Sequence, residues 1–169
     1  MISIITPTYN RASTLDRLFD SLLKQSCKDF EWIIVDDGSI DGTINVVNDF
    51  LNTKKLNIKY IFQENQGKPA ALNRGLENST GDYIFPVDSD DILTEDSIAT
   101  IISRIKFHEQ QASLFSGLCF RKGDLLGVAL GKAIQDENLE FISCSATEIK
   151  NIFQVDMAYC FKKEYMLIN

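Results

Sequence analysis

Residues 81–91 (GDYIFPVDSDD) decide how the fold of this chain is predicted. The first part of the stretch is apolar and β-prone, which predicts a strand over residues 82–87. Three carboxylates follow it within four residues, those of Asp88, Asp90 and Asp91. Like charges this close repel one another. A positive partner is therefore expected among them.

The same arrangement, a strand followed by a polar turn, is predicted three more times upstream. Short β-branched or aromatic runs predict strands over residues 3–7, 30–35 and 58–63. Apolar residues at helical spacing predict intervening helices over residues 13–25, 43–51, 69–78 and 98–105, and Ser13 with Asp16 matches a capping box at the first of them. This alternation predicts an α/β fold with a mostly parallel sheet covered on both faces.

The pattern weakens beyond Lys106. Residues 114–120 and 125–130 resemble a hairpin, residues 145–153 a short helix, and residues 155–161 a further strand. We therefore expect one structural domain with a less regular second part.

A polar cluster follows each of the first four predicted strands, at residues 8–11, 36–39, 65–68 and 88–91. The carboxyl ends of parallel strands lie at one edge of a sheet, so one cleft is expected to collect all four clusters. Turn chemistry alone would explain any one of them. Four clusters at the same strand end indicate a ligand site.

Composition excludes several classes of protein. The net charge is −7 and the pI about 4.7, which argues against a nucleic-acid partner. The four cysteines form no C-x-x-C pair, and the chain has one histidine, so a zinc site is not expected. No apolar run reaches membrane-spanning length and no signal peptide is recognisable, so a cytoplasmic location is expected.

A phosphate-bearing ligand needs groups that bind its negative charge, and a glycine-rich loop often supplies them. This sequence has no such loop after its first strand. Neither G-x-G-x-x-G nor a P-loop motif follows the first strand. A Mg²⁺ or Mn²⁺ ion between Asp88, Asp90 and a diphosphate would neutralise both sides. Such a complex explains how an acidic site can bind an anion.

Four motifs resemble, in order and spacing, those of the inverting family 2 glycosyltransferases, which have the GT-A fold. They are TPTYNR at 6–11, VDDGSIDGT at 35–43, NQGKPAALNRGL at 65–76 and GDYIFPVDSDD at 81–91. The resemblance spans about the first hundred residues. It implies a GT-A (Rossmann-like) three-layer sandwich and inverting, metal-dependent transfer from a nucleotide-diphosphate sugar. It also implies a glycan or lipid-linked acceptor, in bacterial polysaccharide or cell-surface glycan synthesis.

The resemblance also implies residue roles. Asp37 would accept the uracil ring N–H of a UDP-sugar, and Tyr9 would lie against the base or ribose. Lys68 would approach the phosphates or ribose. The full donor set implied is Pro7, Thr8, Tyr9, Arg11, Asp37, Gly67, Lys68, Arg74, Asp88 and Ser89.

The metal and the flanking turns have implied roles as well. Asp90 would be the main ligand of Mn²⁺ or Mg²⁺, with Asp88 contacting the metal or the ribose. Asp91 would orient that shell or cap the next turn. Structural roles are expected for Asp36, Asp41, Thr43, Asn73 and Gly75.

The chain departs from the family pattern in lacking an acidic motif for the general base, for which Asp156 is a candidate. It resembles a donor-binding region, residues 1–106, with the start of an acceptor region, 107–169, truncated at the C-terminus. Missing segments would then account for any association with the inner face of the membrane. Two alternatives stay open: a non-catalytic or truncated nucleotide-sugar-binding module, and a sugar-nucleotide pyrophosphorylase, although TPTYNR lacks the G-x-G-T-R loop of the latter.

Overall fold

The computed structural model describes residues 1–111, 115–124, 126, 128, 130 and 157–166. The strands are β1 (Ile2–Thr8), β2 (Phe30–Asp36), β3 (Ile58–Phe62), β4 (Tyr83–Pro86), β5 (Gly117–Arg121) and β6 (Met157–Lys162). The helices are α1 (Ala12–Leu23), α2 (Thr43–Thr53), α3 (Lys68–Glu77), α4 (Ser97–Gln110) and the short α6 (Lys163–Met166).

The strands form a sheet in the order β3-β2-β1-β4-β6-β5. β1 lies between β2 and β4 and is parallel to both, and β2 is parallel to β3. β4 and β6 are antiparallel. The chain therefore runs outward from β1 to β3 and returns to the other side of β1 as β4. This reversal is the place where open α/β sheets bind ligands, at the carboxyl ends of the strands.

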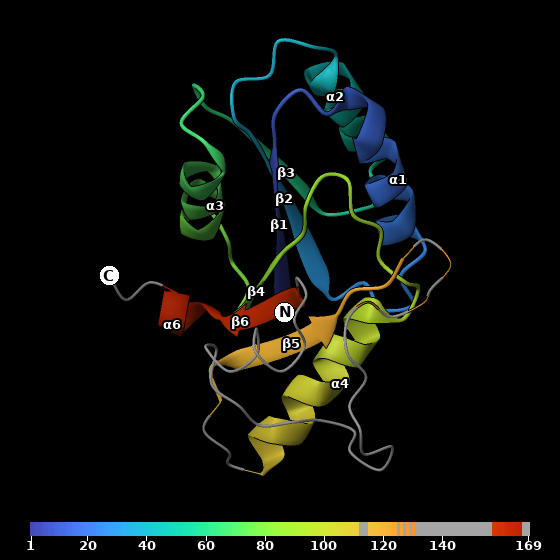
Figure 1. The fold of residues 1–169 in the computed structure, drawn as a ribbon, viewed down its shortest axis with the longest axis vertical. Coiled ribbons are helices and arrows are strands. Elements are labelled where there is room, and N and C mark those ends of the chain that lie inside the picture. The colour runs from blue at the N-terminus through green and yellow to red at the C-terminus, as the bar shows by residue number, and fades with distance from the viewer. Residues whose placement is uncertain (112–114, 125, 127, 129, 131–156, 167–169) are drawn as a thin grey trace. The chain divides into compact units, whose positions relative to one another are not determined.

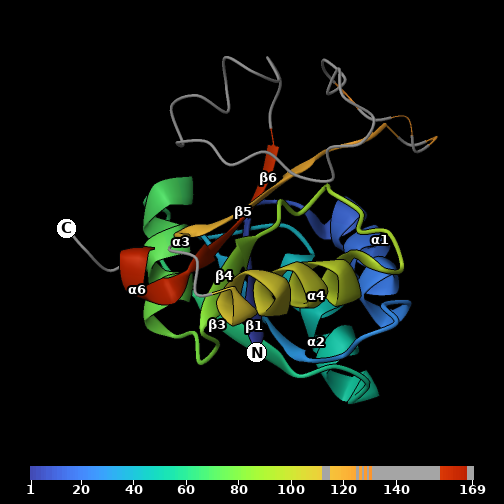
Figure 2. The same ribbon diagram turned by 90° about the horizontal axis from the view of Figure 1, so that it is seen from below.

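Helices cover both faces of the parallel part of the sheet, as the sequence predicts. Figures 1 and 2 show α3 on one face and α1 with α2 on the other. Under α3 the buried apolar cluster consists of Ile5, Ile33, Val35, Ala71, Leu76 and Ile84. A Cβ on Gly75 would collide with Cγ2 of Ile5. Glycine at this position therefore lets α3 lie close to β1.

The opposite face is packed with aromatic rings. Phe19 of α1 stacks on Phe50 of α2 with ring centroids 4.1 Å apart, and both stack on Trp32 of β2. The indole Nε1 of the fully buried Trp32 donates to Thr6 Oγ1 at 2.9 Å. These contacts hold α1 and α2 against β1 and β2, whose ends carry the first two polar clusters.

The predicted capping box of α1 is wrong. The helix begins at Ala12 with Arg11 as its N-cap, and the side chain of Arg11 makes no capping hydrogen bond. The N–H groups of Arg11 and Ala12 instead donate to Thr43 Oγ1 and Asp41 Oδ2, each at 3.2 Å. Asp41 also accepts the N–H of Thr43 at 2.9 Å, so these two residues start α2 as expected and tie it to α1.

The chain divides into two compact units, Met1–Leu118 with Cys160–Asn169, and Cys119–Tyr159. After β5 the backbone turns back, with Leu130 N donating to Lys122 O at 2.8 Å, as in the predicted hairpin. β6 confirms the strand predicted over 155–161 in its described residues. The helix predicted over 145–153 lies outside the described residues. Within the described ranges, no helix combines the length and the apolar character needed to cross a bilayer.

Candidate functional site

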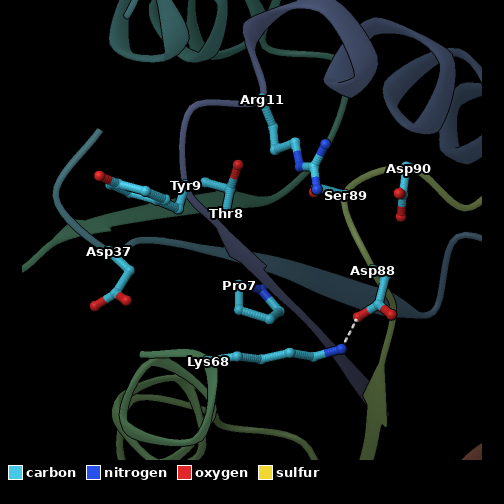
Figure 3. Close-up of a pocket in the computed structure, with 9 residues that line it drawn as sticks. All are labelled: Pro7, Thr8, Tyr9, Arg11, Asp37, Lys68, Asp88, Ser89 and Asp90. Atoms are coloured by element: carbon cyan, nitrogen blue, oxygen red, sulfur yellow. Dashed lines mark ion pairs between the residues drawn. The ribbon is translucent and has the colours of Figure 1, made fainter. Parts of the chain in front are cut away.

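A pocket of about 290 Å³ opens at the carboxyl ends of β1, β2 and β4, within the first unit (Figure 3). Its lining consists of Pro7, Thr8, Tyr9, Arg11, Asp37, Lys68, Asp88, Ser89 and Asp90. One residue or more comes from each of the four polar clusters. The structure therefore confirms the prediction that one cleft brings the four polar clusters together.

Nine of the eleven residues predicted for donor and metal line this pocket, and Gly67 and Arg74 do not. Arg74 is exposed on α3, where its guanidinium lies 3.5 Å from the Glu77 carboxylate. Gly67 donates its N–H to Asp37 Oδ2 at 2.7 Å instead. Its φ of +87° is in the left-handed region that favours glycine.

Asp37 is held from two sides and is only 4% exposed. Its N–H donates to Thr8 O at 2.8 Å, which fixes its backbone to the end of β1. Its carboxylate accepts the side-chain amide of Gln63 at 2.7 Å and the backbone N–H groups of Gln66 at 2.9 Å and Gly67 at 2.7 Å. Burial favours the neutral acid, but these three hydrogen bonds outweigh it and hold the pKa of Asp37 below its usual range.

The neighbouring Asp36 has the structural role that we expected of it. Its carboxylate accepts the N–H of Ser39 and the hydroxyl of Tyr60, each at 2.8 Å. Burial, together with this hydrogen bond and the charge of Asp36, raises the pKa of Tyr60 well above its usual range. Asp36 thereby fixes the turn that presents Asp37.

Asn10 fixes the loop that carries Tyr9 and Arg11. Its φ is +52°, a conformation in which asparagine is enriched. It donates its N–H to Ser39 Oγ at 2.8 Å and accepts the N–H of Ile40 at 2.9 Å. Sequence reasoning missed this role, although an asparagine directly after a strand is a usable signal.

The charged side chains at the Asp88 end of the pocket come from three elements. In Figure 3, Arg11 extends from the loop after β1 toward Ser89 on the loop after β4. Lys68, at the start of α3, reaches across to Asp88, and its Nζ lies 2.6 Å from Asp88 Oδ1. The positive partner required by the acidic stretch is thus, in part, a lysine of the chain itself.

The remaining carboxylates of this region suit a divalent cation. Asp90 is exposed and Asp88 half-buried, and both line the pocket. Within the described part of the chain, no three His, Cys, Asp or Glu side chains are grouped to hold a metal. Mg²⁺ commonly takes one or two carboxylates together with phosphate oxygens and water. The carboxylates of Asp88 and Asp90 in one pocket supply the protein ligands of that pattern.

The hydroxyl of Thr8 is a further polar group of this pocket. Thr8 is 3% exposed, and its Oγ1 has no hydrogen-bond partner in the described ranges. Buried hydroxyls are rarely left unpaired in folded proteins. The Thr8 hydroxyl is therefore available to bind a molecule in the pocket.

The family model described as Glycosyl transferase family 2 matches residues 3–130 of this chain. The chain belongs to glycosyltransferase family 2. A relative, glycosyltransferase GlyA of Streptococcus pneumoniae, is 31% identical over 153 residues, which are 90% of this chain and 22% of that protein.

Two solved structures are similar in fold. The mannosyltransferase PcManGT of Pyrobaculum calidifontis, in complex with GDP-Man and Mn²⁺, is 27% identical with a TM-score of 0.60, over 71% of this chain and 34% of that one. S. aureus TarS 1-349, in complex with UDP-GlcNAc, is 23% identical with a TM-score of 0.73, over 98% and 46%. These likenesses agree with the predicted GT-A fold. The chain spans less than half the length of these relatives.

Proposed function

We propose that this chain is the donor-binding part of a glycosyltransferase and that its pocket binds a nucleoside-diphosphate sugar together with a divalent cation. One observation carries the proposal. A buried, ionised Asp37 and the Asp88–Asp90 pair line the same pocket, with Lys68 in that lining too. The ring N–H of a pyrimidine requires an acceptor such as Asp37. A diphosphate requires positive charge, which Lys68 and a cation on Asp88 and Asp90 would supply. The complexes of TarS with UDP-GlcNAc and of PcManGT with GDP-Man and Mn²⁺ support it.

At the base end, Asp37 accepts the ring N–H of uracil and Tyr9 packs against the base or ribose. A carboxylate only accepts hydrogen bonds, and uracil N3 only donates. Cytosine carries no N3 proton, so a UDP-sugar is the proposed donor. Thr8 supplies a hydroxyl with unused hydrogen-bonding capacity.

At the diphosphate end, Asp88 and Asp90 hold Mn²⁺ or Mg²⁺. When bound, the ion neutralises negative charge on the diphosphate and so assists its departure. Lys68 leaves its ion pair with Asp88 and binds a phosphate oxygen instead. Arg11 and Ser89 line the pocket next to the diphosphate. Residues 1–106 thus form the proposed donor region.

Inverting transfer needs a base that takes the proton of the attacking acceptor hydroxyl. Asp37, Asp88 and Asp90 are assigned to the donor and its cation, so the base is another group. Asp156 stays a prediction and lies outside the described residues. The proposed acceptor is a glycan or lipid-linked hydroxyl, in cell-surface glycan synthesis at the cytoplasmic face of the membrane.

Metal dependence tests this proposal. Calorimetric titration of UDP should give clear binding with Mn²⁺ and a collapse in EDTA, because the two carboxylates alone would repel the diphosphate. Asp90→Asn should weaken Mn²⁺-dependent binding more than Asp91→Asn, since Asp90 lines the pocket and Asp91 does not. Equal UDP affinity with and without chelator would refute the metal bridge. A larger effect at Asp91 would show that the ligand set is misplaced by one residue.

A further inference from the structure

Asp37 has one hydrogen-bonding position left to offer a ligand. An ionised carboxylate has about four acceptor positions, two on each oxygen. Oδ1 accepts from the Gln63 amide and from Gln66 N–H, which fills it. Oδ2 accepts from Gly67 N–H alone among the hydrogen bonds of the described residues. The remaining acceptor is therefore on Oδ2.

Gln63 is built into the sheet edge in a way that fixes its side chain. It directly follows β3, and its N–H donates to Asp36 O at 2.9 Å, which continues the ladder between β2 and β3. The loop after it packs closely on the Asp37 turn, because a Cβ on Gly38 would lie 2.9 Å from Asn65 N. Gln63 itself does not line the pocket. Its amide thus contacts Asp37 without itself lining the pocket.

We infer that Gln63 is a positioning and specificity residue: its amide occupies Oδ1 of Asp37 and leaves a single acceptor, on Oδ2, to read the ring N–H of the base. The inference rests on the proposed nucleotide site. With one acceptor in a fixed place, a base that offers N3–H is selected. Without the Gln63 amide, Oδ1 keeps only the Gln66 N–H, and the carboxylate is freer to turn. It can then present an acceptor to the exocyclic amino group of cytosine, which weakens the discrimination.

The same geometry supplies matched variants. Gln63→Met keeps side-chain length and removes the donor. Gln63→Lys restores a donor to Oδ1. Gln66→Ala is the control, because Gln66 contacts Asp37 through its backbone N–H, which the substitution retains.

The experiment is calorimetric titration of UDP and CDP, with Mn²⁺, against the parent chain and the three variants, after circular dichroism has shown each to be folded. We expect the ratio of UDP to CDP affinity to fall roughly three- to tenfold in Gln63→Met, the range of one hydrogen bond. The ratio should stay at the parent value in Gln66→Ala and recover in Gln63→Lys. If the pocket binds purines, GDP and ADP are compared in the same way, because guanine N1 donates a hydrogen bond and adenine N1 accepts one.

The outcomes separate the two proposals. If the parent chain binds none of the four nucleotides, the proposed function fails before any variant is needed. If the parent discriminates and Gln63→Met discriminates equally well, the positioning role is overturned while the proposed function stands. An equal loss for both nucleotides of a pair also overturns it, because that result describes a residue needed only for structure.

Discussion

At the scale of single residues, the charge balance of the pocket depends on Lys68. Its ammonium pairs with Asp88 at 2.6 Å, although both side chains are partly exposed. Exposed ion pairs contribute little to folding stability. The value of this lysine is therefore expected in ligand binding, where a diphosphate competes for the same ammonium.

Lys68→Met should weaken UDP binding roughly ten- to a hundredfold, the value of a charge-assisted hydrogen bond. Uridine, which lacks phosphates, should bind the variant as well as the parent. Lys24→Met, in an exposed residue at the end of α1, is the matched control. Calorimetry with both ligands checks this. A proportional loss for uridine would mean that Lys68 shapes the pocket rather than binding phosphate.

Asp37 and Gln63 show how far sequence reasoning reaches at this scale. Asp37 was predictable, because it directly follows a strand within a recognisable motif. The contact between Gln63 and Asp37 was not, since it depends on the register of β3 against β2, which aligns Phe62 with Asp36. The ion pair of Lys68 with Asp88 was also missed, because it joins residues twenty positions apart. Their contact depends on how α3 and β4 are placed in the fold.

At the scale of elements, Glu31 ties three segments together at the amino ends of the strands. It lies in β2, is 5% exposed, and accepts Ser3 Oγ and Thr80 N, each at 2.6 Å, and Gly81 N at 3.2 Å. Burial opposes its ionisation, but these bonds prevail and hold the pKa of Glu31 below its usual range. β1, β2 and the turn into β4 thus share one carboxylate.

The pKa shift of Glu31 predicts a pH dependence of stability. The folded pKa is below the unfolded value of about 4.3. The stabilisation is therefore complete above that pH and is lost as the pH falls through the folded pKa. Glu31→Gln should lower the free energy of unfolding at pH 7 by about 1–3 kcal/mol, because the donors from Ser3, Thr80 and Gly81 lose a charged partner.

Urea denaturation of parent and variant at pH 7 and pH 3.5 measures this difference. It should shrink at the lower pH, which is below the unfolded pKa and where the parent loses part of the contribution of the carboxylate. Glu77→Gln, in an exposed residue of α3, should show little difference at either pH. A Glu31→Gln penalty that does not change with pH would indicate packing rather than charge.

The start of α1 illustrates why element boundaries are harder to predict than elements. The periodic apolar residues of α1 correctly predicted the helix. Its first turn is satisfied by Asp41 and Thr43, about thirty residues away. A local capping box could not reveal a cap supplied by another loop.

At the scale of the whole molecule, the four parallel strands and their flanking helices followed from the sequence. Each strand is a short apolar or aromatic run, and each helix has apolar residues at helical spacing. The antiparallel insertion of β6 beside β4 did not, since Tyr83 pairs with Lys162 across a long stretch of chain. Every residue of the pocket belongs to the unit that contains the parallel strands. The central claim is accordingly that this unit binds a nucleoside diphosphate and a divalent cation.

A crystal structure of the chain grown with UDP and Mn²⁺ tests that claim most directly. The account predicts Mn²⁺ coordinated by Asp90, with or without Asp88, and by the diphosphate. It also predicts Lys68 turned toward a phosphate oxygen and the uracil N3–H on Asp37 Oδ2. Nucleotide bound outside this pocket, or bound within it with the base at the Asp88–Asp90 end, would contradict the account.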